Sequence, residues 1–311
     1  MVAAWMMRQG KGTATAIALI LLSSLLYVLG YSLSKHLVVM DGLTPLQVTF
    51  LRCSFVLAGS LVAAAWPKSG VRLRRLLRPA RRWEQRAAAA SLVASNALAV
   101  VAYGLMDVTS ASALGFVAPL LLTALSGLIL REKVSVLRWL GAGLGFAGVL
   151  LIVGPWQGAS AIGMMAALAA ACAYAVYQVL LRRLRDVATA VDTTMQVGLV
   201  GVVLLAGGML IFWHPLGLAA LSLAILFTAI QTAALACLAA ALRRGEASRL
   251  APWQFTGLIW AMMLDAIMFS VSPTMVSLLG GLMIVAGGVA AQLEHQPTWL
   301  RTRRQWVKAC R

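Results

Sequence analysis

The basic residues of this chain lie almost entirely on one side of a series of apolar stretches. Of the 26 Lys and Arg residues, 24 fall in six short segments, one before the first apolar stretch and one after every second stretch. Only Lys35 and Arg52 lie elsewhere. The loops between them, near residues 36–44, 107–110, 154–159, 213–216 and 271–274, contain no Lys or Arg. Because loops rich in Lys and Arg stay on the cytoplasmic side of a membrane, both termini are predicted to be cytoplasmic.

The composition agrees with a protein embedded in a bilayer. The chain is 61% hydrophobic and 11% charged, whereas about a quarter of the residues in a soluble protein carry charge. Roughly 20 apolar residues form one spanning helix, and the sequence predicts an all-α polytopic membrane protein with ten of them. The expected helices lie near residues 13–35, 45–66, 87–106, 110–130, 136–154, 159–181, 192–212, 217–242, 250–270 and 275–293.

The formal net charge of +17 is explained by this topology, so no nucleic-acid partner is expected. The basic segment 71–86 is placed to contact anionic lipid headgroups, although its topological role alone would account for it. The four cysteines and three histidines lack the spacing of a metal site or a catalytic triad. We therefore expect no cofactor, no metal and no enzymatic activity.

Two stretches of the chain repeat weakly at a distance. Leu140-Gly141 aligns with Leu279-Gly280 at an offset of 139, and the end of the first helix, from Ser34, aligns with Leu181 onward at an offset of 147. A half with five helices crosses the membrane an odd number of times, so a second copy enters from the opposite side. The pattern predicts two inverted five-helix repeats, residues 1–157 and 158–296, followed by a basic cytoplasmic tail, 297–311.

The same residues carry a family resemblance. The stretch from Gly115 to Gly141, with Pro119, Glu132 and the pair Arg138-Trp139, resembles the first repeat of EamA-type members of the drug/metabolite transporter superfamily. Features of the second half resemble the second repeat, but Phe269-Ser-Val-Ser-Pro273 lacks the acid of the usual Phe-Gly-Glu-x-Pro motif. The resemblance implies a secondary transporter whose common substrates are amino acids or similar amphiphiles.

Polar residues recur along one face of several predicted helices. In a bilayer such residues face the helix bundle or a wet cavity, because lipid offers them no partners. We expect these stripes to converge on one central cavity, with interhelical hydrogen bonds as the alternative role. The candidate substrate contacts are Tyr27, Tyr31, Arg52, Asn96, Tyr103, Tyr177, Gln178, Gln231, Gln254 and Trp260.

Arg52 and Asp265 are the charged residues expected deep in the membrane, where a charge costs about 2.5 to 3.5 kcal/mol on the insertion scale. Asp265 is the acid able to carry a proton across the bilayer, so it is the candidate coupling residue. Arg52 is the candidate partner for an anionic group of the substrate. A salt bridge between the two is the structural alternative.

These observations predict a secondary transporter that moves a small metabolite, amino-acid-like compound or drug across the bacterial inner membrane, with export as the expected direction. No Gly-x-x-x-x-Gly-Lys-Ser/Thr motif for nucleotide binding occurs. Two alternatives remain at this stage: an assembly subunit without transport activity, and a membrane enzyme acting on lipid phosphates. The sequence assigns neither a substrate nor an oligomeric state.

Overall fold

The computed structural model describes residues 11–65, 76, 79, 81–118, 121, 136–153, 160–184, 187–244 and 253–293. Within these residues the secondary structure consists of ten helices and no strand, which confirms the predicted all-α class. The helices are α2 (Lys11–Val39), α3 (Pro45–Ala64), α5 (Arg82–Leu105), α6 (Val108–Gly115), α8 (Val136–Val153), α9 (Ala161–Leu184), α10 (Ala190–Phe212), α11 (Leu218–Arg244), α13 (Thr256–Phe269) and α14 (Met275–Leu293).

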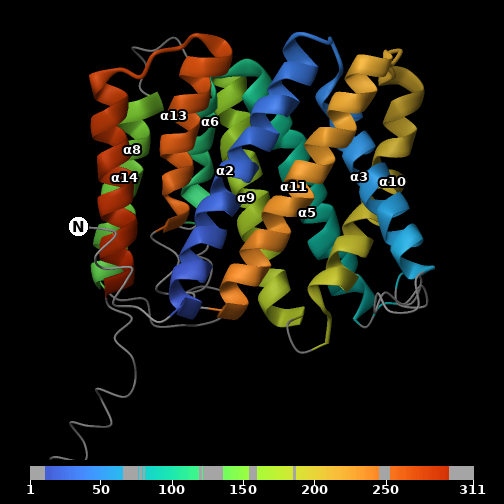
Figure 1. Ribbon diagram of the computed structural model, residues 1–311, viewed down its shortest axis with the longest axis horizontal. Helices are drawn as coiled ribbons and strands as arrows, with labels where there is room; N and C mark the ends of the chain where they lie inside the picture. The colour runs from blue at the N-terminus through green and yellow to red at the C-terminus, as the bar shows by residue number, and fades with distance from the viewer. Residues whose placement is uncertain are drawn as a thin grey trace, which may run out of the picture.

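The helices have the length and composition of a membrane bundle. Six of them, α2, α3, α5, α9, α10 and α11, are long and apolar enough to cross a bilayer, and shorter apolar helices include α13 and parts of α8 and α14. Figure 1 shows the helices standing side by side, with the start of α2 and the end of α14 on the same side of the bundle. The polytopic membrane fold is therefore confirmed.

Several helix starts follow from local capping chemistry. Thr44 caps α3 by accepting a hydrogen bond from the Gln47 amide, and Pro45 occupies the first turn, where its missing N–H is not needed. Thr189 and Asp192 form a reciprocal capping box at the start of α10. These side chains satisfy backbone donors that a bilayer interface would otherwise leave poorly hydrated.

The helix pairing follows an approximate twofold symmetry. In Figure 1, α8 packs with α14 at one end of the bundle and α3 with α10 at the other, while the α2–α11 and α5–α9 pairs lie between them. In chain order, α2 of the first half corresponds to α9 of the second, and α5 corresponds to α11. The α2–α11 pair therefore corresponds to the α9–α5 pair. The α8–α14 and α3–α10 pairs each correspond to themselves. This pairing is the arrangement expected of two five-helix repeats.

Two hydrogen bonds show the same twofold relation between individual residues. Ser23 of α2 donates to the carbonyl oxygen of Ala234 on α11 at 2.7 Å, and Ser95 of α5 donates to the carbonyl oxygen of Ala170 on α9 at 2.9 Å. Positions 23 and 170 differ by 147, and positions 95 and 234 differ by 139. These are the offsets at which the sequence repeats, so the two contacts occupy equivalent places in the two halves.

Some sequence predictions concern positions outside the described residues. The predicted boundaries at 157/158 and 296/297 lie there, as do Pro119 and Glu132 of the family motif. The division into residues 1–157, 158–296 and 297–311 therefore stays a prediction.

Glycines allow α8 and α14 to approach until their backbones touch. A Cβ atom at Gly148 would lie 2.5 Å from the carbonyl oxygen of Gly280, and one at Gly287 would lie 2.4 Å from that of Gly141. Real Cβ atoms do not approach backbone oxygens so closely, so these positions require glycine. The close packing of α8 against α14 therefore depends on these glycines.

A single methyl group tests this helix crossing. Gly148→Ala should destabilise the protein by about 1 to 3 kcal/mol, because the added methyl overpacks a backbone contact. The melting temperature in detergent measures this loss. Gly143→Ala is the matched control, because a Cβ at Gly143 meets no atom within 4 Å. Equal melting temperatures for the two variants would contradict the close crossing.

Candidate functional site

A cavity of about 220 Å³ lies inside the bundle. Its walls come from α2, α5 and α6 in the first half and from α9, α11, α13 and the residues just before α13 in the second. Alanines form much of the surface, and the polar groups are serine and tyrosine hydroxyls together with the amide of Gln254. The cavity is smaller than the roughly 300 to 1,000 Å³ of typical sites for drug-sized ligands, so it fits a small molecule.

The lining follows the internal symmetry. Tyr27 and Tyr174 both line the cavity and differ by 147 positions, while Gly115 and Gln254 both line it and differ by 139. The aromatic rings of Phe116 and Phe255, also 139 positions apart, lie 5.3 Å from one another between ring centroids. The cavity therefore sits where equivalent surfaces of the two halves meet.

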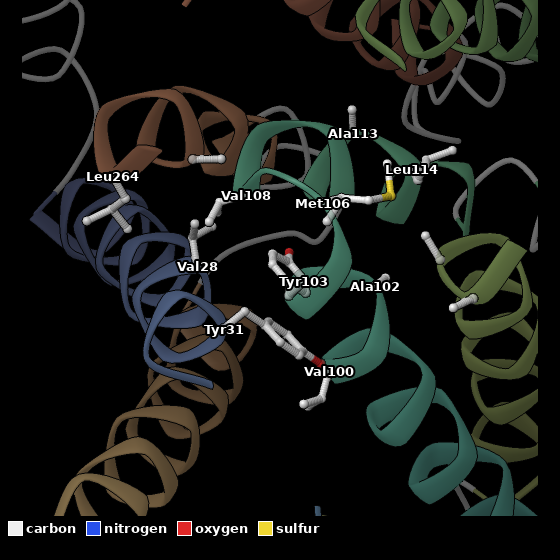
Figure 2. Packing of buried hydrophobic residues seen from close by; sticks show 14 of the residues in the cluster. Val28, Tyr31, Val100, Ala102, Tyr103, Met106, Val108, Ala113, Leu114 and Leu264 are labelled. Atoms are coloured by element: carbon white, nitrogen blue, oxygen red, sulfur yellow. The ribbon is translucent and has the colours of Figure 1, made fainter. Parts of the chain in front are cut away.

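Two stacked tyrosines line the cavity at its end toward the α5–α6 turn. The rings of Tyr31 and Tyr103 are nearly parallel, with centroids 4.6 Å apart and an interplanar angle of 7°. Figure 2 shows Tyr31 reaching from α2 toward Tyr103 on α5. The Tyr31 hydroxyl donates to Oδ1 of Asn96 at 3.1 Å, and the Tyr103 and Ser112 hydroxyls share a hydrogen bond of 3.0 Å. These bonds fix both rings and satisfy their polar atoms.

Four of the predicted site residues line the cavity directly: Tyr27, Tyr31, Tyr103 and Gln254. Asn96 acts behind them through its hydrogen bond to Tyr31. Trp260 donates its indole N–H to the hydroxyl of Ser24, a lining residue, at 3.2 Å. Trp260 and Asn96 thus position residues of the cavity wall from the adjoining layer.

Gln231 lies behind Tyr27 in the contact between α11 and α2. Its side chain is fully buried, with Nε2 at 3.5 Å from the carbonyl oxygen of Tyr27. A Cβ atom at Gly30 would lie 2.8 Å from Cγ of Gln231, so this glycine makes room for the glutamine. Gln231 packs in the interface that supports the cavity and is not part of its lining.

Three other predicted site residues also lie outside the lining. The ring of Tyr177 contacts that of Tyr174, with centroids 5.8 Å apart. Gln178 is half-buried at the position equivalent to Tyr31. The guanidinium of Arg52 lies 6.0 Å from the ring centroid of Phe227, at the limit of a cation–π contact. Among the described residues Arg52 makes no ion pair.

Asp265 binds the start of another helix. Its Oδ1 accepts a hydrogen bond from the Val108 amide at 2.9 Å, and its Oδ2 accepts one from the Thr109 amide at 2.6 Å. These amides begin α6, where unpaired N–H groups and the helix dipole favour an anion. In the part of the chain that the structure describes, Asp265 is thus bound by backbone groups and is not paired with Arg52. Its predicted coupling role stays a prediction.

Lys35 binds the same turn from α2. Its ammonium group donates to the carbonyl oxygen of Met106 at 2.9 Å, lies 4.3 Å from the ring centroid of Phe269, and is attracted by the carboxylates of Asp265 and Asp107. Lys35 and Asp265 therefore hold the α5–α6 turn from α2 and α13. We call Lys35, Asp265 and the turn 106–109 the outer clamp.

Sequence reasoning set Lys35 apart from the basic segments but did not predict this role. The sequence did offer a signal, because Lys35 is one of only two basic residues outside the six basic segments. It also missed Gly115 and Phe116, which line the cavity. Applying the offset of 139 to the predicted residue Gln254 would have found Gly115, because the repeat gives equivalent residues equivalent places.

The outer clamp predicts a stability defect in Asp265→Asn. An asparagine presents one acceptor and one donor group to two backbone N–H groups, so one hydrogen bond is lost and two donors face one another. Hydrogen bonds to charged groups contribute about 1.5 to 3 kcal/mol, and we expect a loss of that size. Thermal unfolding of the purified variant measures it.

The matched control is Asp41→Asn, which changes an exposed carboxylate 3.5 Å from His36 on the same side of the bundle. Exposed ion pairs contribute little, so this variant should melt like the native protein. If Asp265→Asn is equally stable, the carboxylate does not hold the α5–α6 turn, and a change in the pH dependence of transport would then favour the coupling role.

Comparison with known proteins finds a family resemblance in the first half of the chain. Residues 14–154 match the model of the EamA-like transporter family. One solved structure, described only as the crystal structure of a protein, matches with a TM-score of 0.62 and 21% sequence identity, over 92% of this chain and 97% of the other. At this identity the match shows the fold alone. Among curated proteins none matches the chain. Residues 14–154 are similar to the EamA-like transporter family.

Proposed function

We propose that this protein is a secondary transporter that carries a small metabolite or drug across the cytoplasmic membrane by alternating access between its two halves. The observation that carries the proposal is the cavity between α2, α5 and α6 of one half and α9, α11 and α13 of the other. A site shared by two inverted repeats can open to either side when one half tilts against the other. The match of residues 14–154 to the EamA-like transporter family supports the same function.

The shape of the cavity supports export. At its outer end the stacked rings of Tyr31 and Tyr103 lie beneath the outer clamp. In the other direction the lining extends to Leu238, within about two turns of the end of α11 at Arg244. A substrate would thus enter from the side on which α11 ends, which we assign to the cytoplasm.

The two rival functions lack an equivalent feature. A catalytic site for lipid phosphates needs acids or histidines gathered at the interface, and the described residues contain no group of three or more His, Cys, Asp or Glu able to hold a metal ion. An assembly subunit would not require a cavity on the internal symmetry axis. Coupling to an ion gradient, to a counter-substrate or to neither would be consistent with the absence of a nucleotide-binding motif.

Cysteine labelling in intact cells tests the proposed orientation. Met40 is 64% exposed in the turn after α2, and Val187 is 41% exposed in the turn after α9, on the opposite side. In a background without native cysteines, Met40→Cys should react with an impermeant maleimide, and Val187→Cys should react only after lysis. The reverse pattern would invert the assignment of the two faces and with it the direction of transport.

Filling the cavity tests transport itself. Gly115 lines the cavity, and a Cβ there would meet no atom within 4 Å, so Gly115→Trp should occupy substrate space without disturbing the fold. We expect a thermal-shift screen of a metabolite panel to identify ligands of the native protein, and proteoliposomes containing Gly115→Trp to lose at least about 90% of the corresponding flux.

The control is Gly207→Trp on α10, where a Cβ also meets no atom within 4 Å and which does not line the cavity. This variant should keep the native flux. Loss of flux in both variants, or in neither, would argue against transport through this cavity. A native protein that moves none of the ligands it binds would leave the assembly-subunit alternative.

A further inference from the structure

The cavity contains no charged side chain among its lining residues in the part of the chain described. The charged groups inside the bundle have other contacts. Lys35 binds the Met106 carbonyl, Asp265 binds the first amides of α6, and Arg52 faces the Phe227 ring. A ligand that entered with a full charge would lose its hydration and find no counter-ion, which is costly in a site of low polarity.

Most polar groups of the wall already form hydrogen bonds within the protein. The Tyr31, Tyr103 and Ser24 hydroxyls bond to Asn96, Ser112 and Thr256 respectively. Gln254 differs from them. Its side chain lines the cavity and is exposed, and within the described residues its amide makes no hydrogen bond. A primary amide offers both donors and an acceptor, so it recognises a neutral polar group.

Aromatic faces provide the remaining recognition surface. Tyr27 meets Tyr31 edge to face, with ring centroids 5.0 Å apart, and it is 38% exposed while lining the cavity. Tyr174 lines the opposite half at the equivalent position. Aromatic rings favour contact with another flat ring in stacked or edge-on arrangements. The alanines around them leave the space for such a ring.

We propose that the cavity binds a small, uncharged aromatic compound that carries a neutral hydrogen-bonding group, with Gln254 as the residue that recognises this group. The proposal rests on the proposed transport function and narrows its substrate class. It differs from the expectation of an amino-acid-like zwitterion, because neither charge of a zwitterion would have a partner among the described residues of the wall. Tyr27 and Tyr174 would hold the ring.

A set of matched probes tests the charge preference. Nicotinamide is neutral, nicotinate replaces its amide by a carboxylate, and 3-picolylamine carries an ammonium group at neutral pH. Cyclohexanecarboxamide keeps the amide and lacks the aromatic ring. Binding to the full-length protein in nanodiscs, measured by calorimetry, should be at least about tenfold tighter for nicotinamide than for either charged probe, and weaker for cyclohexanecarboxamide.

A variant tests the role of Gln254. Gln254→Glu places a carboxylate in the cavity and should raise affinity for 3-picolylamine by about tenfold or more while weakening nicotinamide. Met40→Glu adds the same charge in an exposed turn outside the cavity and should leave all affinities unchanged. If Gln254→Glu binds the probes as the native protein does, Gln254 is not the recognition residue and the proposal fails.

The results separate this inference from the transport function. Native affinity for nicotinate or 3-picolylamine that equals or exceeds that for nicotinamide overturns the inference, as does a failure to bind any of the four probes. Flux of a charged metabolite that Gly115→Trp blocks would overturn it while confirming transport. Selective binding of nicotinamide without flux of any ligand would support the inference and count against the transport function.

Discussion

Inside a bilayer a backbone N–H or C=O group has no water to bind, and the turns of this protein meet that constraint with side chains from distant helices. Lys35 and Asp265 bind the α5–α6 turn from α2 and α13. Gln47 of α3 exchanges two hydrogen bonds with the backbone of His214, at 2.7 and 3.1 Å, in the turn between α10 and α11. Each turn is therefore secured by an element remote in sequence, and the arrangement of the helices depends on these bonds.

The same constraint relates the two halves. Gln196 of α10 donates to the carbonyl oxygen of Leu76 at 2.6 Å, in the segment between α3 and α5. Gln47 thus binds the segment after the second half's helix α10, and Gln196 binds the segment after the first half's helix α3. Each half satisfies backbone groups of the other, which ties the repeats together near both membrane surfaces while the cavity lies between them.

The asymmetries within this repeat give the cavity its chemistry. Tyr31 is equivalent to Gln178, and Gly115 is equivalent to Gln254, so the aromatic stack belongs to the first half and the Gln254 amide to the second. A ligand whose ring lies between Tyr27 and Tyr174 and whose polar group meets Gln254 would contact both halves. A molecule bound in this way would be sensitive to the relative tilt of the halves, as alternating access requires.

Hydropathy determined the all-α class and the ten helices, because these follow from local burial. Polar stripes identified Tyr27, Tyr31, Tyr103 and Gln254 as cavity residues, since helical periodicity shows which face is turned inward. Only the tertiary structure decided which polar groups bind one another. Arg52 and Asp265 looked alike as buried charges in the sequence, yet one faces an aromatic ring and the other holds a helix start. That difference depends on the amides of α6, more than 150 residues from Asp265, and contacts so remote leave no local pattern.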